Sequence, residues 1–308
     1  MYAGVFLIAS KIDKKANNAI LEQEKIDARR ESEFMHIITN AAFCANYDNY
    51  DFLLNVAHSV AATRTGIELN IYSDKPEFMK NQQNQKARFA DVPITFHGPF
   101  TDVEAASAPG TLERQRFIDA YKYAFDIYEE FCGKSIVLHT HKMRDIPEFG
   151  KERMRGWAIE NINTVGEIAL SRGIRLTVEN VGHWVKNNVL FNEEQFVAMF
   201  DQLPKGIGCL IDIGHALINR WDIFHVVHVL NTRIFSYHLH NNNGCADSHR
   251  PLFETGGRYS AEEMIELLHM IHRCSPDADL ILEYSPGEHI TSKLLIDDLT
   301  LLAKIAAE

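Results

Sequence analysis

The amino-acid sequence predicts an α/β protein in which strands and helices alternate as a single (β/α)8 (TIM) barrel. Three observations support this fold. Short runs rich in β-branched and aromatic residues occur eight times along the chain. Longer stretches with apolar residues at three- and four-residue spacing separate these runs. Successive strands start about 35 residues apart, close to the roughly 31 residues per βα unit of a 250-residue barrel.

Apart from the first, the candidate strands end in turn residues or polar side chains, as strands of a buried parallel sheet do. Eight such units in one chain favour a closed barrel over an open, doubly wound sheet. In chain order the strands are 35–43 (MHIITNAAF), 66–73 (GIELNIYS), 92–98 (VPITFHG), 135–141 (SIVLHTH), 174–180 (IRLTVEN), 207–214 (IGCLIDIG), 233–240 (RIFSYHLH) and 280–285 (LILEYS).

The candidate helices lie between these strands, and two of them carry clear start signals. Asn192 precedes two glutamates, and Ser260 stands just before Glu262 and Glu263. Such residues accept the free N–H groups of a first helical turn, and acidic side chains there match the helix dipole. The expected helices are 50–62, 112–132, 151–171, 192–202, 261–272 and 290–306.

The 308-residue chain divides into a polar N-terminal extension, 1–34, and one barrel domain, 35–308. No glycine-rich linker or low-complexity tract interrupts the second part, so one domain is the simplest organisation. The extension is expected to be an extra element packed on the barrel or an arm that meets a partner.

Composition restricts the function classes. The 31 Lys and Arg residues against 42 Asp and Glu residues leave a net charge of −11, which argues against a general basic surface for nucleic acid. Five widely spaced cysteines without a CxxC pair are typical of reduced thiols. The opening MYAGVFLIAS is a poor signal peptide, and no apolar run is long enough to cross a bilayer. We therefore expect a cytoplasmic protein that does not enter membranes.

Acids and histidines recur where the strands end. Active sites of (β/α)8 barrels form at the carboxyl ends of the strands, so polar residues there are informative. A carboxylate that ends an apolar run costs several kcal/mol unless it is paired or binds a metal. The residues concerned are His97, His139, Glu179, Asp212, His215, His238 or His240, Asp247, His249 and Glu283.

A shared divalent cation is the simplest explanation for this repetition. Glutamate, aspartate and imidazole together suit Zn, Mn, Co or Fe better than Ca, whose ligands are oxygens. Mg is less suited to imidazole. One ion is the first expectation, but the number of ligand-type residues leaves up to three open.

The motifs in this order resemble the xylose-isomerase-like TIM barrels, a superfamily of sugar-phosphate isomerases and epimerases that also includes AP endonucleases of the endonuclease IV type. The resemblance covers roughly residues 35–308. It rests on HGPF (97–100), VLHTH (137–141), TVEN (177–180), DIGH (212–215), YHLHNNNG (237–244), DSHRPL (247–252) and LEYS (282–285).

The resemblance implies one central metal held by four side chains. His238 is preferred to His240 because it opens an H-L-x-[DN] run similar to that of the family, although both alternate to the same face of the strand. The implied ligands are Glu179, Asp212, His238 and Glu283.

The resemblance also implies an acid/base role for Glu179 and Glu283. Isomerisation or epimerisation of a sugar or sugar phosphate passes through an enediolate, which a divalent metal stabilises. A carboxylate on each face can remove and return the proton. A small-molecule sugar is therefore the expected partner, and a homo-oligomer would be ordinary for such an enzyme.

Further residues are candidates for substrate binding, each with a plain structural alternative. His215 could bond a substrate oxygen, while His183 and Trp184 could form an apolar wall for a sugar or simply cover the barrel mouth. Arg250 follows strand seven, where barrels often bind phosphate. Glu68 could orient a ligand or pair with a neighbour. The residues expected to bind substrate or additional metal are His97, His139, His215, Asp247 and His249.

The alternative function is that of a zinc-dependent AP endonuclease. The repair endonucleases of this superfamily hold three zinc ions, and their nine ligands correspond to the strand-end set with His238 in it. Three features oppose this function: the chain is acidic, strand one lacks a GAHVS-like opening, and no basic, aromatic-interleaved loops are present to hold a nucleic-acid backbone. A non-catalytic sugar- or metal-binding module is disfavoured because no ligand position is replaced by an inert residue.

Overall fold

The computed structural model is a closed barrel of eight parallel strands in the order β1-β2-β3-β4-β5-β6-β7-β8. It describes residues 37–39, 49–60, 65–142, 146, 148–183, 188–287 and 289–308. The N-terminal extension, 1–34, lies outside the described residues. The strands are β1 (Ile37–Thr39), β2 (Thr65–Asn70), β3 (Ile94–His97), β4 (Ile136–His139), β5 (Leu176–Glu179), β6 (Gly208–Asp212), β7 (Ile234–Leu239) and β8 (Asp279–Leu282).

The barrel closes where the first strand meets the last. Ile38 of β1 is in register with Gly66 of β2 on one side and with Ile281 of β8 on the other. Every strand pair around the ring is parallel, so all carboxyl ends meet at one rim. The structure confirms the predicted fold and places each predicted strand in the ring.

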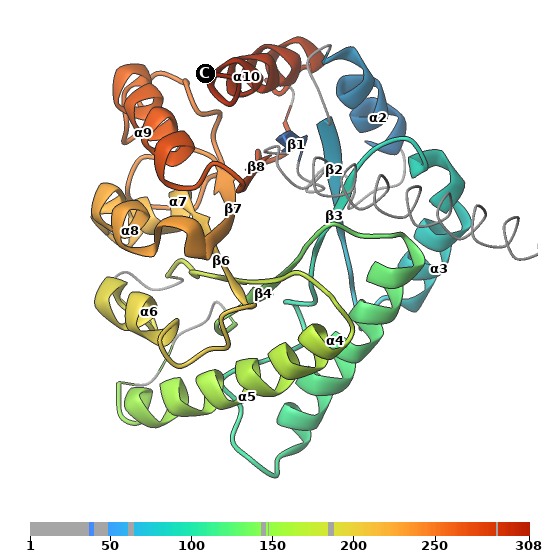
Figure 1. Ribbon diagram of the computed structural model, residues 1–308, viewed down its shortest axis with the longest axis vertical. Helices are drawn as coiled ribbons and strands as arrows, with labels where there is room; N and C mark the ends of the chain where they lie inside the picture. The colour runs from blue at the N-terminus through green and yellow to red at the C-terminus, as the bar shows by residue number, and fades with distance from the viewer. Residues whose placement is uncertain are drawn as a thin grey trace, which may run out of the picture. The chain divides into compact units, whose positions relative to one another are not determined.

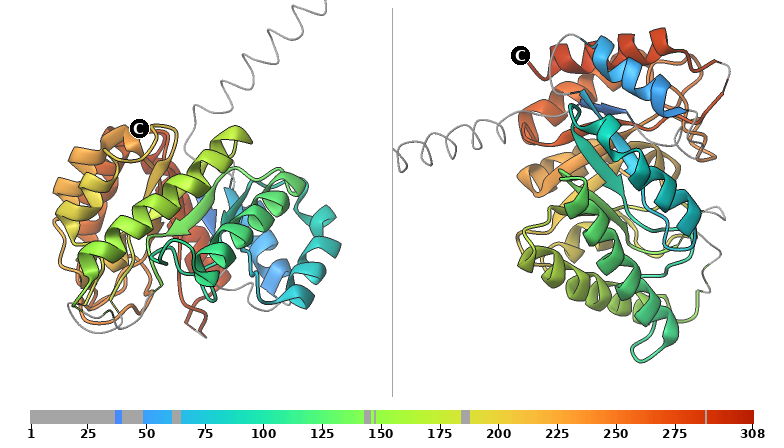
Figure 2. Two further views of the ribbon diagram at one scale, coloured as in Figure 1. Left: turned by 90° about the horizontal axis from the view of Figure 1, so that it is seen from below. Right: turned by 90° about the vertical axis from the view of Figure 1, so that its right-hand side faces the viewer.

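The helices form an outer layer around the strands (Figure 1), and two further directions of view show the same arrangement (Figure 2). None of the described helices is both long and apolar enough to cross a membrane. The helices are α2 (Asn49–Ser59), α3 (Pro76–Asn84), α4 (Leu112–Glu130), α5 (Lys151–Ser171), α6 (Glu193–Met199), α7 (Ile213–Ile218), α8 (Ile223–Leu230), α9 (Ala261–Cys274) and α10 (Ser292–Ile305).

The predicted helix starts at Asn192 and Ser260 are confirmed. Each side chain accepts the N–H of the third helical residue, and that residue's side chain accepts the N–H of the cap, which completes a capping box. Three helices lie outside those expected from periodicity: α3 is mostly polar, and α7 and α8 have only six and eight residues.

The predicted sixth strand, 207–214, extends too far. β6 ends at Asp212 because its side chain accepts the backbone N–H of His215 at 2.6 Å, which makes Asp212 the N-cap of α7. Helix α7 therefore begins directly at the rim of the barrel. This early start brings His215 back towards the strand ends.

Candidate metal centre

Strands β3 to β8 each deliver a ligand-type side chain to the carboxyl rim. His97, His139, Glu179 and Asp212 are the last residues of β3, β4, β5 and β6, and Glu283 directly follows β8. Register partners bring neighbours together: His139 is paired with Glu179, and Asp212 with His238. The sheet itself therefore assembles residues that are far apart in the sequence.

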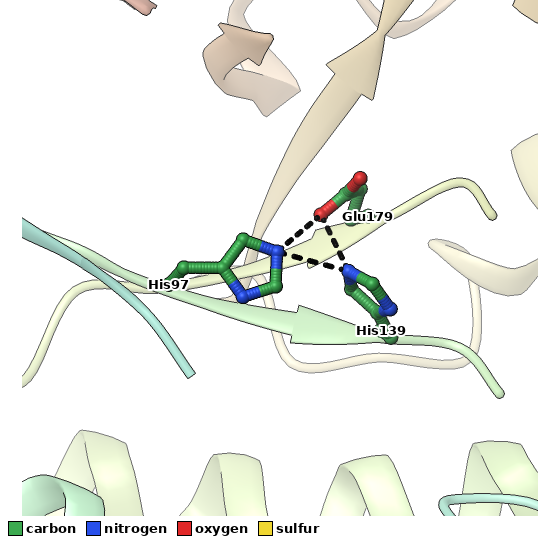
Figure 3. A group of neighbouring side chains, drawn as sticks. All are labelled: His97, His139 and Glu179. Carbon is green, nitrogen blue, oxygen red and sulfur yellow. Dashed lines mark hydrogen bonds and ion pairs between the residues drawn. The ribbon is translucent and has the colours of Figure 1, made fainter. Parts of the chain in front are cut away.

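His97, His139 and Glu179 form the first group of possible metal ligands. Figure 3 shows one nitrogen of each histidine and one carboxylate oxygen facing one another. Glu179 Oε2 lies 3.1 Å from His139 Nε2 and 3.6 Å from His97 Nε2, and the two nitrogens are 3.0 Å apart. The Nδ1 of His97 lies 3.0 Å from the Gly98 carbonyl oxygen, which leaves its Nε2 lone pair facing the group.

Glu179, Asp212 and His238 form the second group, and Glu283 adjoins it. His238 Nδ1 lies 2.8 Å from Glu283 Oε2, 3.7 Å from Glu179 Oε1 and 3.8 Å from Asp212 Oδ2. Three carboxylates thus surround one imidazole nitrogen. His238, Asp212 and Glu179 are at most 1% exposed.

His215, Asp247 and His249 form the third group. Asp247 Oδ2 lies 3.1 Å from His215 Nε2 and 3.2 Å from His249 Nε2. The Nδ1 atoms of these histidines lie 2.9 and 3.0 Å from the carbonyl oxygens of Asn180 and Glu283. Both imidazoles therefore point Nε2 towards the carboxylate, as His97 does.

His240 joins the cluster at a different place from His238. Its Nε2 lies 3.0 and 3.1 Å from the two carboxylate oxygens of Asp212, and its ring stacks on His249 with 4.0 Å between centroids. His240, His249 and Glu283 form a fourth group of possible ligands. The geometry associates His238 with Glu179, Asp212 and Glu283, while His240 contacts Asp212 from the side of His249.

The cluster fits divalent cations. Buried atoms without a hydrogen bond normally have a partner such as water or an ion. Within the described part of the chain, several side-chain atoms of this cluster are buried and have no hydrogen-bond partner, among them Glu179 Oε2, His238 Nδ1, His240 Nδ1, Asp247 Oδ1 and Glu283 Oε2. The mixture of carboxylates and imidazoles suits Zn, Mn or Co.

Residues 61–298 match the xylose isomerase-like TIM barrel family, which covers well over half of the chain. The protein belongs to the xylose isomerase-like TIM barrel family. A search of curated proteins finds no match.

Solved structures repeat the fold of this xylose isomerase-like barrel at low identity. A D-tagatose 3-epimerase-like protein is 18% identical with a TM-score of 0.71, covering 89% of this chain and 98% of its own. The IOLI protein with a bound zinc atom is 17% identical with a TM-score of 0.65, covering 89% and 96%. An AP endonuclease, family 2, from Brucella melitensis is 14% identical with a TM-score of 0.62, covering 85% and 96%.

Neighbouring groups of opposite charge shift the pKa values of side chains in this xylose isomerase-like site. Burial opposes the charged form of Glu179, but His139 and His238 outweigh it and hold the pKa of this carboxyl well below its usual range. Burial likewise opposes a charge on His215, yet Asp212 and Asp247 raise its pKa well above the ordinary value. Strong perturbation of this kind is typical of functional sites.

The pKa values of His97, which is buried, and His249, which is partly exposed, shift in opposite directions. Burial lowers the pKa of His97, and the neighbouring His139 lowers it further. Burial also opposes a charge on His249, but the hydrogen bond to Asp247 and the charge of Glu283 raise its pKa to about 9. His249 therefore carries a proton at neutral pH unless a metal replaces it.

The remaining candidates occupy distinct places. Glu68 is fully buried and its Oε1 lies 3.1 Å from His238 Nε2. His183 Nδ1 lies 3.0 Å from the side-chain oxygen of Asn219. Arg250 is engaged by Glu254 at 2.9 and 3.0 Å, which occupies its guanidinium within its own loop. Trp184 lies outside the described residues.

Two neighbours of the site were not assigned roles from the sequence. Asn180 brackets Asp212: its amide donates to the Asp212 carbonyl at 3.0 Å, and its side-chain oxygen accepts the Asp212 N–H at 2.7 Å. The Phe100 ring stands 4.7 Å from the His97 ring and 5.5 Å from that of His139. Asn180 lies in the TVEN motif and Phe100 in the HGPF motif. Their position next to the strand ends was the one feature of the sequence that could have pointed to a role in the site.

Proposed function

We propose that this protein is a divalent-metal-dependent sugar isomerase or epimerase. The observation that carries the proposal is the convergence of Glu179 and Glu283 on His238 Nδ1, at 3.7 and 2.8 Å. One carboxylate comes from β5 and the other follows β8. A substrate bound between them would meet a proton acceptor on one side and a proton donor on the other.

The cluster provides what proton transfer beside a carbonyl requires. Glu179 and Glu283 would hold or return the proton on the two faces of the sugar, while Asp212 and His238 would complete the ligand set of a Mn, Co, Zn or Mg ion. When bound, such a cation stabilises the negative oxygens of an enediolate. The sugar 3-epimerases among the structural relatives are in keeping with a sugar or sugar-phosphate substrate.

Solvent deuterium reports this chemistry directly. The metal-loaded protein, incubated with a panel of ketoses and ketose phosphates in deuterated water, is expected to place deuterium on the carbon beside the carbonyl of its substrate, detected by NMR. Glu179→Gln and Glu283→Gln should each reduce the exchange about 10²- to 10⁴-fold. Exchange with no member of the panel by the metal-loaded protein would count against the proposal.

A matched variant separates chemistry from folding. Asp298 is also a buried carboxylate, but it lies in α10 and accepts a hydrogen bond from Tyr284 at 2.7 Å. Asp298→Asn removes a buried charge without touching the metal cluster, so its exchange rate should stay near that of the unmodified protein. An equal loss in all three variants would indicate a general effect of burial.

A second function, phosphodiester hydrolysis of the AP endonuclease kind, is favoured by a separate observation. All nine strand-end residues lie in overlapping groups, with His97 and His139 on one side of Glu179 and His215, Asp247 and His249 on the other side of the cluster. Metal content by elemental mass spectrometry distinguishes the two functions. About one ion per chain supports the isomerase, and about three zinc ions with cleavage of an abasic duplex support the nuclease.

A further inference from the structure

The imidazoles of the cluster are anchored in two different ways. His97, His215 and His249 each place Nδ1 at 2.9 to 3.0 Å from a backbone carbonyl oxygen and turn Nε2 towards the carboxylates. His238 has the opposite orientation. Its Nδ1 faces Glu283, Glu179 and Asp212, and its Nε2 faces the carboxylate of Glu68.

Glu68 comes from β2, on the other side of the barrel interior from β7. It is 0% exposed, as is Thr95 beside it. The two are register partners on β2 and β3, and the Thr95 hydroxyl donates to Glu68 Oε2 at 3.1 Å. The other carboxylate oxygen lies 3.1 Å from His238 Nε2, an ion-pair contact. A buried carboxylate held in this way has a fixed direction.

We propose that Glu68, held by Thr95, is a positioning residue that fixes the ring orientation and tautomer of His238, so that Nδ1 serves as the metal ligand. A carboxylate can only accept a proton donor, so it retains the hydrogen on Nε2 and leaves the lone pair on Nδ1. That lone pair points to the place where three further carboxylates meet. The inference rests on the proposed function, because it assumes that the cluster binds a divalent cation.

The same contact should tune the strength of the ligand. A carboxylate behind a metal-bound imidazole makes the imidazole more basic and restricts its rotation, and removal of such a partner typically lowers metal affinity 10- to 100-fold. The backbone carbonyls behind His97, His215 and His249 carry no full charge. Unlike these three imidazoles, His238 therefore has a ligand strength that depends on one replaceable side chain.

Metal affinity of the full-length protein tests the inference. Zn²⁺ dissociation constants are measured by chelator competition, and the visible spectrum of the Co²⁺-loaded protein reports ligand geometry. We expect Glu68→Leu to weaken the Zn²⁺ site at His238 10- to 100-fold. Glu68→Gln keeps an acceptor without charge and should lose less, and Thr95→Val should lose least. Asp298→Asn serves as the buried-carboxylate control and should match the unmodified protein in both measurements.

A measurement on the unmodified protein guards against variants that do not fold. With ¹⁵N-labelled histidine and ¹¹³Cd²⁺ as the probe, the His238 signals are assigned by their loss in His238→Asn. We expect scalar coupling of ¹¹³Cd to Nδ1 of His238 and a proton on its Nε2. Coupling of the cadmium to Nε2 would overturn the inference whatever the variants show.

The outcomes separate this inference from the proposed function. If the unmodified protein binds none of the three metals, both fail. If it binds them and Glu68→Leu has the same affinity and Co²⁺ spectrum as the unmodified protein, the positioning role fails while the metal centre stands. Weaker binding with an altered Co²⁺ spectrum in the Glu68 variants, with Asp298→Asn unchanged, supports the positioning role.

Discussion

At the scale of single residues, the geometry of the site depends on which atoms of each side chain already have a hydrogen-bond partner. Asp212 illustrates this: its Oδ1 accepts the His215 N–H at 2.6 Å while the same carboxylate contacts His240 at 3.0 and 3.1 Å. One side chain thus starts a helix, orients an imidazole and belongs to the second ligand group. Replacing it would alter the backbone and the ligand set together, which makes Asp212 a poor choice for testing either role alone.

The raised pKa of His249 leads to a prediction about metal binding. In the metal-free protein His249 has a pKa of about 9, above the usual 6.5, so it holds a proton throughout the range between these values. A metal ligand must be the neutral imidazole, so binding at His249 releases that proton below pH 9. We expect the contribution of His249 to metal affinity to rise with pH up to about 9 and to level off above it.

Calorimetry in buffers of different ionisation enthalpy measures this proton release. At pH 7 we expect about one proton from His249 for the ion bound there, plus those of other imidazoles held protonated by the cluster. His249→Ala should release about one proton fewer. Metal binding at pH 7 with no proton release would show that His249 is neutral or not a ligand.

At the scale of elements, the short helix α7 is part of the candidate metal centre itself. It begins directly after Asp212 and carries His215 within its first turn. Gly214 lies beneath the ring of His240, and a Cβ atom built there would collide with Cε1, Nδ1 and Nε2 of that ring. A short helix of this kind does not appear in a periodicity analysis, yet it determines where two imidazoles stand.

Two glycine substitutions should have opposite effects on stability. Gly214→Ala forces the His240 ring to move and should cost about 1–3 kcal/mol. Gly156→Ala lies on the exposed side of α5, where an added Cβ meets nothing within 4 Å, and should stabilise the protein by about 0.5–1 kcal/mol. Urea unfolding measures both changes. Equal effects of the two substitutions would contradict the close contact beneath His240.

At the scale of the whole molecule, the two ends of the barrel carry different kinds of charged side chains. The carboxyl rim collects charged ligand-type side chains, whereas at the amino end Arg175, which precedes β5, forms an ion pair. Its guanidinium donates to the fully buried carboxylate of Asp279 on β8 at 2.8 Å and to the carbonyl of Phe235 on β7 at 2.9 Å. This contact links β5 to strands that are not its neighbours in the ring, at the end opposite to the candidate metal centre.

Arg175→Leu should therefore destabilise the barrel without changing the metal centre. Loss of the partner of a buried carboxylate costs about 3–5 kcal/mol. Urea unfolding should show this loss, and metal content should stay the same. Arg172→Leu is the control: its partners Asp126 and Glu129 are exposed, so it should cost less than about 1 kcal/mol. A loss of metal from Arg175→Leu would show that the two ends are coupled.

Removal of metal should lower the stability of the whole barrel. The ligand-type residues come from β3, β4, β5, β6, β7 and the segment after β8, so bound ions would cross-link most of the ring. An ion at 100 times its dissociation constant contributes about 2.7 kcal/mol. We expect a chelator to lower the unfolding midpoint, with a smaller shift in Glu283→Gln. Calorimetry before and after chelation measures it, and an unchanged midpoint would argue against a tightly bound ion.

The sequence by itself determined the architecture and the inventory of the site. Alternating strand and helix periodicity predicted the barrel, because the spacing of apolar residues shows which face of each element is buried. This spacing is a local property of the chain and can be read without the fold. Strand ends such as Glu179, Asp212 and Glu283 were identifiable because a carboxylate after an apolar run has no local reason to be there. The start of α6 at Asn192 was visible for the same local reason, a side chain that caps its own helix.

Only the tertiary structure decided how these residues are grouped. How His238 and His240 are placed around Asp212 and Glu283 depends on the register between β6, β7 and β8, which no local pattern specifies. The early end of β6 depends on one hydrogen bond, which the backbone N–H of His215 donates to the Asp212 side chain. The contact between Glu68 and His238 joins β2 to β7 across the barrel interior, and such a pairing exists only once the ring has closed.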